Sequence, residues 1–528
     1  MAKITILDGA RSIGGSKIHL QVGETGVFLD FGMNYKRWGL YYEEYLGPRT
    51  GRGINDPLIL KIIPPLKNFY REDLFPGDFD YSALKIELPV NAIFLSHAHT
   101  DHCGHIGLVR EDIPIYCSPL TAVIMKAMQD TNKSGLFGEM VYMTRRKLLE
   151  DDERIITTGR KKGENKKIGK KVLLLGDKNE AMDEFWNRSP YAESTPFEMR
   201  PLEKAEKEIN NIEFRFFPVD HSILGACAFA FLADSGWVVY TGDLRLHGKN
   251  GDFTEEFIEE ASSLKPLALI IEGTHLEDES SERVSEEEVY WNCLREVRKA
   301  EGKLVVADFA PRNLERLISF LHIAKEAKRK LCVLTKDIYL LEALDCVEGT
   351  NFLAEECLNI LEEMEESRDN WEKKLKEKFR EKFVDHREIK KNPGDYILCL
   401  SFFDIKHLTD IFSEEGGIYI YSSSEAYTEE QKIDFERLKN WLDFLNLRPI
   451  GFYLESPGEP TFPPGYHSSG HATKEDLFDI VRKIRPKYLI PVHTEKPKAY
   501  EELKDVTCMI WEDTNLPGLE VQFLEGKY

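Results

Sequence analysis

Hydrophobic and polar positions form one pattern up to about residue 273 and a different one after it. In the first part the apolar runs are short, rich in β-branched and aromatic residues, and end in turns, which is typical of strands. Examples are NAIFLS at 91–96, IEFRFFPV at 212–219, WVVYTGD at 237–243 and LALIIEG at 267–273. Residues 1–32 predict hairpins at the edge of a sheet, and residues 33–90, rich in Pro, Gly and aromatic side chains, predict loops and short helices.

After Gly273 strands and helices alternate, which predicts βαβ units and a parallel sheet. The strand KLVVADFA at 303–310 precedes a helical pattern at 314–330, and the strand LCVLTKDI follows it. Further along, an apolar residue recurs every four positions, which predicts one long helix with a continuous apolar stripe used for packing. The members of this stripe are Trp371, Leu375, Phe379 and Phe383. The tail returns to a helix at 474–484 and a strand, PKYLIPVH, at 486–493.

Composition narrows the class of protein. The 42% of hydrophobic residues, with 30 Phe and 21 Tyr, exclude a disordered chain, and no apolar run approaches the ~20 residues of a membrane helix. The start, MAKITILDGA, has no basic segment followed by an apolar one, so we expect a cytoplasmic protein without a membrane partner. Nine scattered cysteines without a CxxC pair argue against a disulfide framework or a thiolate zinc site.

The formal charge is −22, from 70 Lys and Arg against 92 Asp and Glu. Taken alone, this acidity counts against a nucleic-acid partner, because phosphates are contacted by Lys and Arg. The charge is unevenly distributed, however. RKKGENKKIGKK at 160–171 has seven basic residues against one Glu, and is either a solvated loop or part of a rim that contacts nucleic acid. The acidic runs at 276–288 and 355–366 predict solvated helix faces and loops.

Histidine is concentrated in one place. Four of the 14 histidines fall within SHAHTDHCGH, directly after the predicted buried strand at 91–96. The pattern HxHxDH puts imidazoles and a carboxylate on one tight loop, and these are ligands that Zn²⁺, and to a lesser extent Mn²⁺ or Fe, accept. We expect His97, His99, Asp101 and His102 to bind metal. His105 lies outside the pattern and is expected to support the loop.

One loop cannot supply all the ligands of two metal ions, so a site with two ions needs further ligands from other strand ends. His221 follows the strand at 212–219, Asp243 ends WVVYTGD, and His493 ends YLIPVH. Each lies where a strand gives way to a loop, which is where a sheet edge collects functional residues.

These residues carry a resemblance to a known family. Asp30, HAHTDH at 97–102, His221 and Asp243 resemble the metallo-β-lactamase superfamily. Glu272 in IEGTH, His471 in SSGHA and His493 in IPVH resemble the motifs of its β-CASP nuclease branch. The set looks most like ribonuclease J and the cleavage-and-polyadenylation endonucleases. It departs from ribonuclease J in having no TGSQGEP-like segment, of which SPGEP at 456–460 keeps only a fragment.

The resemblance implies an α/β fold, the metallo-β-lactamase αββα sandwich with an inserted β-CASP domain built as a parallel-sheet α/β cap. Residues 1–273 would form the first part of the sandwich, 274–465 the β-CASP domain and 466–528 the C-terminal part of the sandwich.

The resemblance also implies two divalent cations, Zn²⁺ with Mn²⁺ as the alternative. One would be held by His97, His99, His221 and Asp243, and the other by Asp101, His102, Asp243 and His493. Asp243 would bridge both, and Asp30 would hold the loop. A metal-binding His493 is typical of RNA-processing members, which favours RNA, single-stranded rather than duplex, as the substrate. A homodimer is a further expectation, because relatives in this family often dimerise.

The implied chemistry is hydrolysis of a phosphodiester. Two cations lower the pKa of a bridging water and neutralise the charge that builds on the phosphoryl oxygen, so that hydroxide attacks in line. The expected catalytic residues are Asp101, Asp243, Glu272 and His471. His471 would contact the scissile phosphate and protonate the departing oxygen, and Glu272 would orient His471. Internal cleavage and trimming from the 5′ end both stay open.

Three alternatives remain. The same fold serves small-molecule hydrolases of thioesters and lactones, against which the long segment at 274–465 counts, since a small substrate does not need it. A DNA nuclease would keep the mechanism and change the substrate. A scaffold that has lost catalysis is disfavoured because every expected ligand position is occupied by a suitable residue.

Overall fold

The computed structural model describes residues 2–43, 45–132, 135–159, 165–277, 283–310, 312–364, 367–412, 415–423, 429–456, 459–510 and 522–524. Residues 160–164 of the basic insert and residues 457–458 of SPGEP lie outside the described residues. None of the described helices is both long and apolar enough to cross a bilayer.

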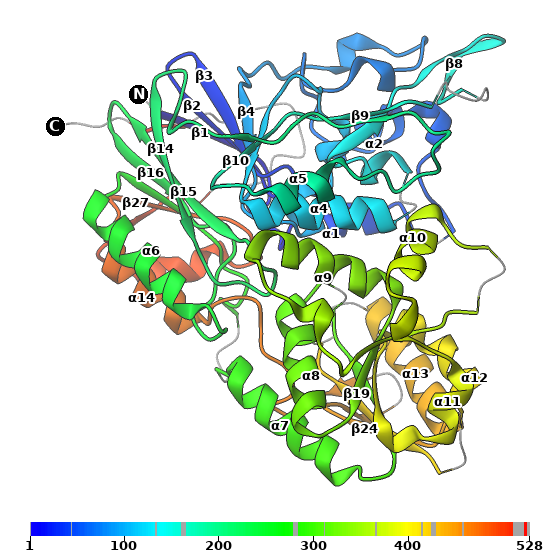
Figure 1. Ribbon diagram of the computed structural model, residues 1–528. Coiled ribbons are helices and arrows are strands. Elements are labelled where there is room, and N and C mark those ends of the chain that lie inside the picture. Colours follow the sequence, from blue (N-terminus) through cyan, green and yellow to red (C-terminus); the bar gives the residue numbers. More distant parts are fainter. Residues whose placement is uncertain are drawn as a thin grey trace.

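The N-terminal half is built around two β-sheets that pack face to face (Figure 1). The first sheet has the order β12 (Glu203–Lys204), β10 (Val172–Leu174), β5 (Ile115–Cys117), β4 (Ala92–Phe94), β3 (Thr25–Leu29), β2 (Lys17–Val22), β1 (Ala2–Asp8) and β29 (Gln522–Leu524). The predicted hairpins are confirmed, because β1, β2 and β3 pair antiparallel near one edge. From β3 to β10 the neighbouring strands run parallel.

The second sheet has the order β13 (Glu208–Ile209), β14 (Ile212–Pro218), β15 (Cys227–Ala233), β16 (Gly236–Tyr240), β17 (Ala268–Ile271), β27 (Tyr488–Pro491) and β28 (Thr507–Cys508). Strand β27 comes from the C-terminal tail and pairs parallel with β17, so the chain returns to the sandwich after the long segment that precedes it.

The sequence of β15 shows why the sheets pack as they do. Phe229 and Phe231 point to the same face and contact the ring of Phe94 in β4, across the space between the sheets. Ala228 and Ala230, on the other face, belong to a separate core under α6 (Gly251–Leu264) and α14 (Lys474–Ile484). Helices α4 (Pro119–Thr131) and α5 (Glu180–Asn187) pack on the outer side of the first sheet. The layers are therefore helix, sheet, sheet, helix.

Residues 286–450 form a separate parallel sheet with helices on both faces, which we call the cap. Its strand order is β21 (Phe383–Val384), β20 (Leu358–Leu361), β19 (Lys330–Val333), β22 (Tyr396–Cys399), β18 (Leu304–Asp308), β23 (Gly417–Tyr421) and β24 (Leu447–Ile450). Its helices are α7 (Glu286–Lys299), α8 (Leu314–Glu326), α9 (Thr335–Glu348), α10 (Asn370–Lys378), α11 (His386–Lys391), α12 (Leu408–Ile411) and α13 (Glu429–Phe444). Every pair of neighbouring described strands in this sheet is parallel, as the alternating pattern predicts.

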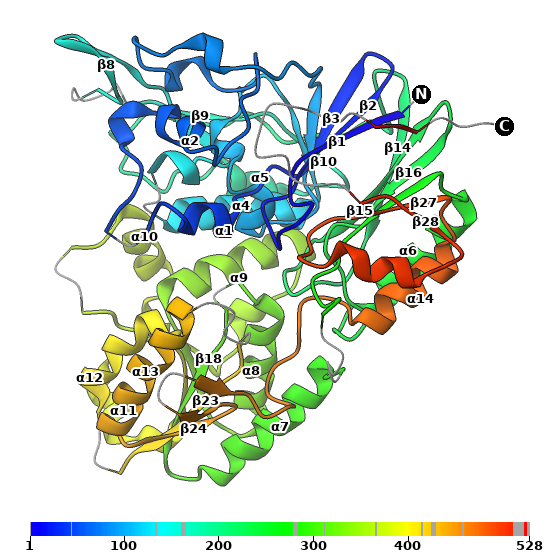
Figure 2. The ribbon, with the colours of Figure 1, turned by 180° about the vertical axis from the view of Figure 1, so that it is seen from behind.

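The cap lies against the sandwich with α9 packed on α4 and α5 (Figures 1 and 2). Shorter elements complete the chain. They are α1 (Tyr35–Gly39), α2 (Asn55–Ile59), α3 (Thr100–Cys103), β6 (Tyr142–Thr144), β7 (Lys147–Leu149), β8 (Asp152–Thr157), β9 (Lys167–Gly169), β11 (Phe197–Glu198), β25 (Tyr453–Ser456) and β26 (Glu459–Thr461). The domain boundaries at residues 273 and 465 stay predictions.

Two expectations within the cap are wrong. The predicted stripe does not lie on one helix, because α10 ends at Lys378 and Phe383 opens β21, where it pairs with Ile360 of β20. Pairing to the edge of a sheet outweighs continuation of the four-residue spacing. The acidic runs are not wholly solvated either. The run at 355–366 contains the buried strand β20, and Glu286, in the run at 276–288, is only 1% exposed.

Candidate metal centre

The loop HAHTDH follows β4 and leads into α3. Asp30 stabilises this loop through hydrogen bonds. Asp30 Oδ1 accepts a hydrogen bond from the Ser96 amide at 2.7 Å, and its Oδ2 accepts from the Ser96 hydroxyl at 2.7 Å and the Tyr240 hydroxyl at 2.7 Å. His102 Nδ1 lies 2.8 Å from Asp30 Oδ2. Asp30 therefore sets the ring orientation of His102 and directs its Nε2 away from the carboxylate.

The structure brings all seven predicted ligands together in two adjoining groups. The first group contains His97, His99 and His221, and the second contains Asp101, His102, Asp243 and His493. Within each group the candidate ligand atoms lie within 4.8 Å of one another.

Asp243 lies between the two groups. Its Oδ2 is 3.0 Å from His102 Nε2, 3.7 Å from His97 Nε2 and 3.9 Å from His221 Nε2. Its Oδ1 is 3.7 Å from His493 Nδ1. One carboxylate thus faces imidazoles of both groups.

Parallel strand pairing explains why distant residues meet here. Asp243, Glu272 and His493 follow β16, β17 and β27, which are parallel neighbours in the second sheet. Their carboxyl ends therefore open at the same edge. His493 has a left-handed backbone with φ of 50°, and its amide donates to the Gly9 carbonyl at 2.7 Å, which turns the side chain into the cluster.

The hydrogen bonds of the imidazoles suit metal binding. His221 Nδ1 donates to the Gly470 carbonyl at 2.5 Å, so its Nε2 carries the lone pair. Burial lowers the pKa of His97 and His221 well below the usual range, and lowers that of His99 to about 4, so these rings are neutral at pH 7. Neutral imidazole is the form that coordinates a cation.

The second group contains a charge pattern that also fits a cation. Burial lowers the pKa of His102, but Asp243, Asp101 and Asp30 outweigh it and raise that pKa well above the usual range. Burial would raise the pKa of Asp243, yet His102 and His493 hold it well below the usual range. Asp243 Oδ1 is buried and has no hydrogen-bond partner among the described residues. An orphaned buried carboxylate oxygen costs free energy, which a divalent cation at this position offsets.

His471 stands beside the cluster and is paired with Glu272. Its Nδ1 lies 2.9 Å from Glu272 Oε2, and one of its nitrogens lies within 4.8 Å of ligand atoms of His221 and Asp243. Burial lowers the pKa of His471, but Glu272 outweighs it and raises the pKa to about 9. Glu272 is fully buried and also accepts hydrogen bonds from the Leu244 amide and the Thr274 hydroxyl.

Three further residues hold the loop that carries His471. Arg245 Nη1 and His247 Nε2 each donate to the Ser469 carbonyl at 3.0 Å, and His275 Nε2 lies 2.6 Å from the Ser469 hydroxyl. No sequence motif assigns a role to these three residues. Their position two to four residues beyond Asp243 and Glu272 is the one sequence feature that points to them. His105 is fully buried against Phe31 and Phe137 and belongs to neither ligand group.

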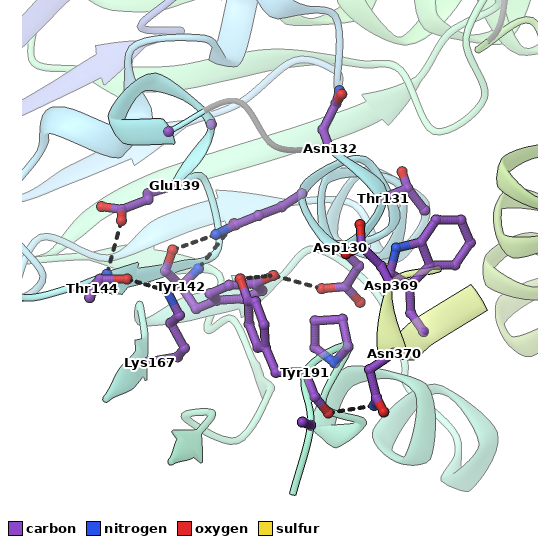
Figure 3. A pocket seen from close by; sticks show the side chains of 16 residues that line it. Asp130, Thr131, Asn132, Glu139, Tyr142, Thr144, Lys167, Tyr191, Asp369 and Asn370 are labelled. Carbon is purple, nitrogen blue, oxygen red and sulfur yellow. Dashed lines mark hydrogen bonds between the residues drawn. The ribbon is translucent and has the colours of Figure 1, made fainter. Parts of the chain in front are cut away.

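A hollow of about 360 Å³ lies elsewhere, between α4, β6, β9 and the start of α10 (Figure 3). Two of its polar side chains have hydrogen-bond partners of their own. Asp130 accepts from Tyr142 at 2.9 Å and from Tyr339 at 2.7 Å, and Asn370 donates to the Tyr191 carbonyl at 2.6 Å. It contains none of the predicted site residues.

Comparison with known proteins identifies related sequences. Residues 466–504, which contain His471 and His493, match the family model of a Zn-dependent metallo-hydrolase RNA specificity domain. The chain is 21% identical over 430 residues to ribonuclease J of Mycoplasma pneumoniae, covering 79% of this chain and 59% of that protein. It is 18% identical over 510 residues to ribonuclease J of Helicobacter pylori 26695, covering 93% and 56%. The chain thus spans less than two thirds of the length of these relatives.

A second comparison concerns the fold. A crystal structure of a protein of unknown function from Enterococcus faecalis V583 matches with a TM-score of 0.65 and 21% identity, over 97% of this chain and 98% of that one. Together with the layers described above, this likeness confirms the predicted fold class, an αββα sandwich with an inserted parallel-sheet cap.

Proposed function

Because the chain is similar to ribonuclease J and matches an RNA specificity domain of Zn-dependent metallo-hydrolases, we propose that it is a metal-dependent ribonuclease of the β-CASP branch of the metallo-β-lactamase superfamily. The observation that carries the proposal is the position of Asp243. Its carboxylate faces the imidazoles of both ligand groups, and the His471–Glu272 pair adjoins it. This arrangement supports phosphodiester hydrolysis with two cations.

We assign one cation to His97, His99, His221 and Asp243, and the other to Asp101, His102, Asp243 and His493. Imidazole nitrogens and carboxylate oxygens favour Zn²⁺, with Mn²⁺ as the alternative. When bound, the cations supply a lowered pKa for water and positive charge for the oxygens of the phosphoryl group.

The protein's own residues carry the proton chemistry. His471 donates from Nδ1 to Glu272, which leaves Nε2 to hold the proton that the departing oxygen needs. Glu272 keeps the ring protonated and fixes its orientation, because it is itself held by Leu244 and Thr274. Asp30 and the Gly470 carbonyl orient His102 and His221 in the same way.

The substrate in this proposal is RNA, single-stranded rather than duplex. It is supported by the match to an RNA specificity domain over the segment that contributes His471 and His493. Internal and 5′-to-3′ cleavage are both within the proposal. A homodimer and a cytoplasmic location stay predictions.

The test uses protein loaded with Zn²⁺ or Mn²⁺ and a panel of substrates. The panel contains single-stranded RNA with a 5′-monophosphate or 5′-triphosphate, duplex RNA, single-stranded DNA and a thioester. We expect cleavage of single-stranded RNA, and its loss in His471→Ala and Asp243→Asn. His322→Ala, an exposed histidine on α8, serves as the control and should cleave as the parent does.

The outcomes separate the alternatives. If both site variants cleave RNA as fast as the parent, the assignment of the metal cluster as the active site is wrong. Hydrolysis of the thioester alone would replace the nuclease by a small-molecule hydrolase, and cleavage of DNA alone would keep the site and change the substrate.

A further inference from the structure

Arg312 joins the cap to the metal loop. It lies between β18 and α8, at the carboxyl edge of the cap sheet, and its Nη1 donates to the Thr100 hydroxyl at 2.8 Å. Thr100 is the first residue of α3 and stands between the predicted ligands His99 and Asp101. A guanidinium from the cap therefore lies directly beside the loop that supplies four of the seven predicted ligands.

Arg312 differs from the other arginines near the contact between the cap and the sandwich. Arg245 is fully buried and pairs with Asp220, Glu286 and Glu315. Arg316, one turn further along, pairs with Glu286 at 2.8 Å. Among the described residues, Arg312 has no carboxylate within ion-pair distance and is only partly buried.

A guanidinium has five N–H donors in a planar fork, and Thr100 takes one of them. The fork matches the oxygens of a phosphate, which it binds through two parallel hydrogen bonds. The hydroxyl of Thr100 is a neutral partner, so it fixes the side chain without neutralising its charge.

We propose that Arg312 binds a backbone phosphate of the nucleic-acid substrate at the edge of the metal cluster. The proposal rests on the proposed function for the identity of the substrate. It gives a chain with a formal charge of −22 a positive charge beside the metal loop that has no ion-pair partner among the described residues. It also gives the cap a direct part in substrate binding, because Arg312 reaches the cluster only while the cap rests on the sandwich.

The competing role is structural, in which Arg312 only ties the cap to α3. The two roles predict different effects on RNA binding when the positive charge of Arg312 is removed. Arg312→Gln keeps a side-chain amide that can donate to Thr100 but removes the charge, whereas Arg312→Lys keeps the charge and removes the fork. A phosphate contact is weakened by both changes and loses its salt dependence only in Arg312→Gln.

The experiment measures binding of a fluorescent, phosphorothioate-linked single-stranded RNA, which is cut slowly, to the metal-loaded protein between 50 and 300 mM salt. For Arg312→Gln we expect roughly tenfold weaker binding, the loss of one charge-assisted contact, and a salt slope smaller by about 0.7. Arg312→Lys should bind with intermediate affinity and the parent slope. The control is Arg448→Gln, an exposed arginine on β24 at the far edge of the cap sheet, and it should match the parent.

Metal content and melting temperature verify that the variants are folded, and if Arg312→Gln fails to fold, the affinity of Arg312→Lys decides. Affinity and salt slope equal to the parent's overturn the Arg312 proposal, even if the parent cuts RNA. If the parent binds RNA but does not cut it, and Arg312→Gln has a reduced salt slope, the phosphate contact is supported and the proposed ribonuclease activity is rejected. If the parent does not bind RNA, both proposals fail.

Discussion

His471 Nδ1 lies 2.9 Å from Oε2 of Glu272, although 199 residues separate the two in the chain. Glu272 follows β17 and His471 precedes α14, which Thr473 opens with a capping box, so two rigid elements fix the pair. Glu272 Oε1 also accepts a hydrogen bond from the Leu244 amide, and Oε2 accepts one from the Thr274 hydroxyl. The carboxylate is thus held from three sides while it holds the imidazole.

Glu272→Gln should lower the rate of RNA cleavage by about 10² to 10⁴, because the amide cannot keep the His471 ring charged and must turn an N–H toward a donor. The metal content should not change, since Glu272 lies outside both ligand groups. Single-turnover cleavage rates and metal analysis of the purified variant check both statements.

The double variant Glu272→Gln/His471→Ala provides the control for this pair. Because the two residues act as a unit, it should be no slower than His471→Ala alone. Multiplicative losses would show that Glu272 acts elsewhere than through His471.

Removal of the cations should destabilise the protein as well as inactivate it. Without them Asp243 Oδ1 stays buried with no hydrogen-bond partner among the described residues. Binding to the folded state alone contributes about 2.7 kcal/mol when the free cation is a hundredfold above its dissociation constant. We expect a chelator to lower the melting temperature by several degrees, and Zn²⁺ to restore it.

Asp243→Asn is the matched variant for this measurement. The chelator should shift its melting temperature less than that of the parent, because it lacks the carboxylate that faces both groups. Equal shifts in both proteins would mean that the cation responsible binds elsewhere.

Arg245 should be among the most sensitive positions for stability. It is fully buried, its partners Asp220, Glu286 and Glu315 are each at most 4% exposed, and Glu286 and Glu315 come from the cap. Arg245→Met removes the guanidinium that these buried carboxylates share and leaves Glu286 with Arg316 as its remaining ion-pair partner among the described residues, which costs about 3 to 5 kcal/mol. Urea unfolding checks this, with Lys204→Met, at an exposed ion pair, expected within about 0.5 kcal/mol of the parent. Equal unfolding midpoints for the two variants would contradict the prediction.

The residues of the site could be predicted from the sequence because the strand pattern shows which residues lie at strand ends. Asp243, Glu272 and His493 each end an apolar run, and parallel strands collect their carboxyl ends at one edge. The ends of the elements were less predictable. At Phe383 the four-residue spacing continued, but pairing with β20 decided the structure.

Contacts across the junction could not be predicted from the sequence. Glu286 lies in an acidic run that resembles a solvated helix face. Packing of α7 against the sandwich brings Arg245 onto it, and packing of α7 against α8 within the cap brings Arg316 onto it. Arg312 likewise has no local pattern. Its role depends on Thr100, 212 residues earlier in the chain.

Asp308 should make the stability of the protein fall as the pH rises. It ends β18 in the cap, is 4% exposed, and accepts a hydrogen bond from the Tyr419 hydroxyl at 2.6 Å. Burial raises its pKa to about 7, so between pH 4 and pH 7 the folded state keeps a proton that the unfolded state has released. The unfolded state then binds fewer protons, and the free energy of unfolding decreases with pH, by at most about 1.4 kcal/mol per unit for this one group.

Asp308→Asn keeps an acceptor for Tyr419 and cannot ionise. Its free energy of unfolding relative to that of the parent should therefore grow from pH 4.5 to pH 7 and then level off. Asp337, with its pKa also raised to about 7 by burial, keeps part of the slope in the variant. Urea unfolding at each half unit of pH measures the difference. An advantage that is constant across this range, or that grows toward acid, would mean that Asp308 is ionised in the folded cap.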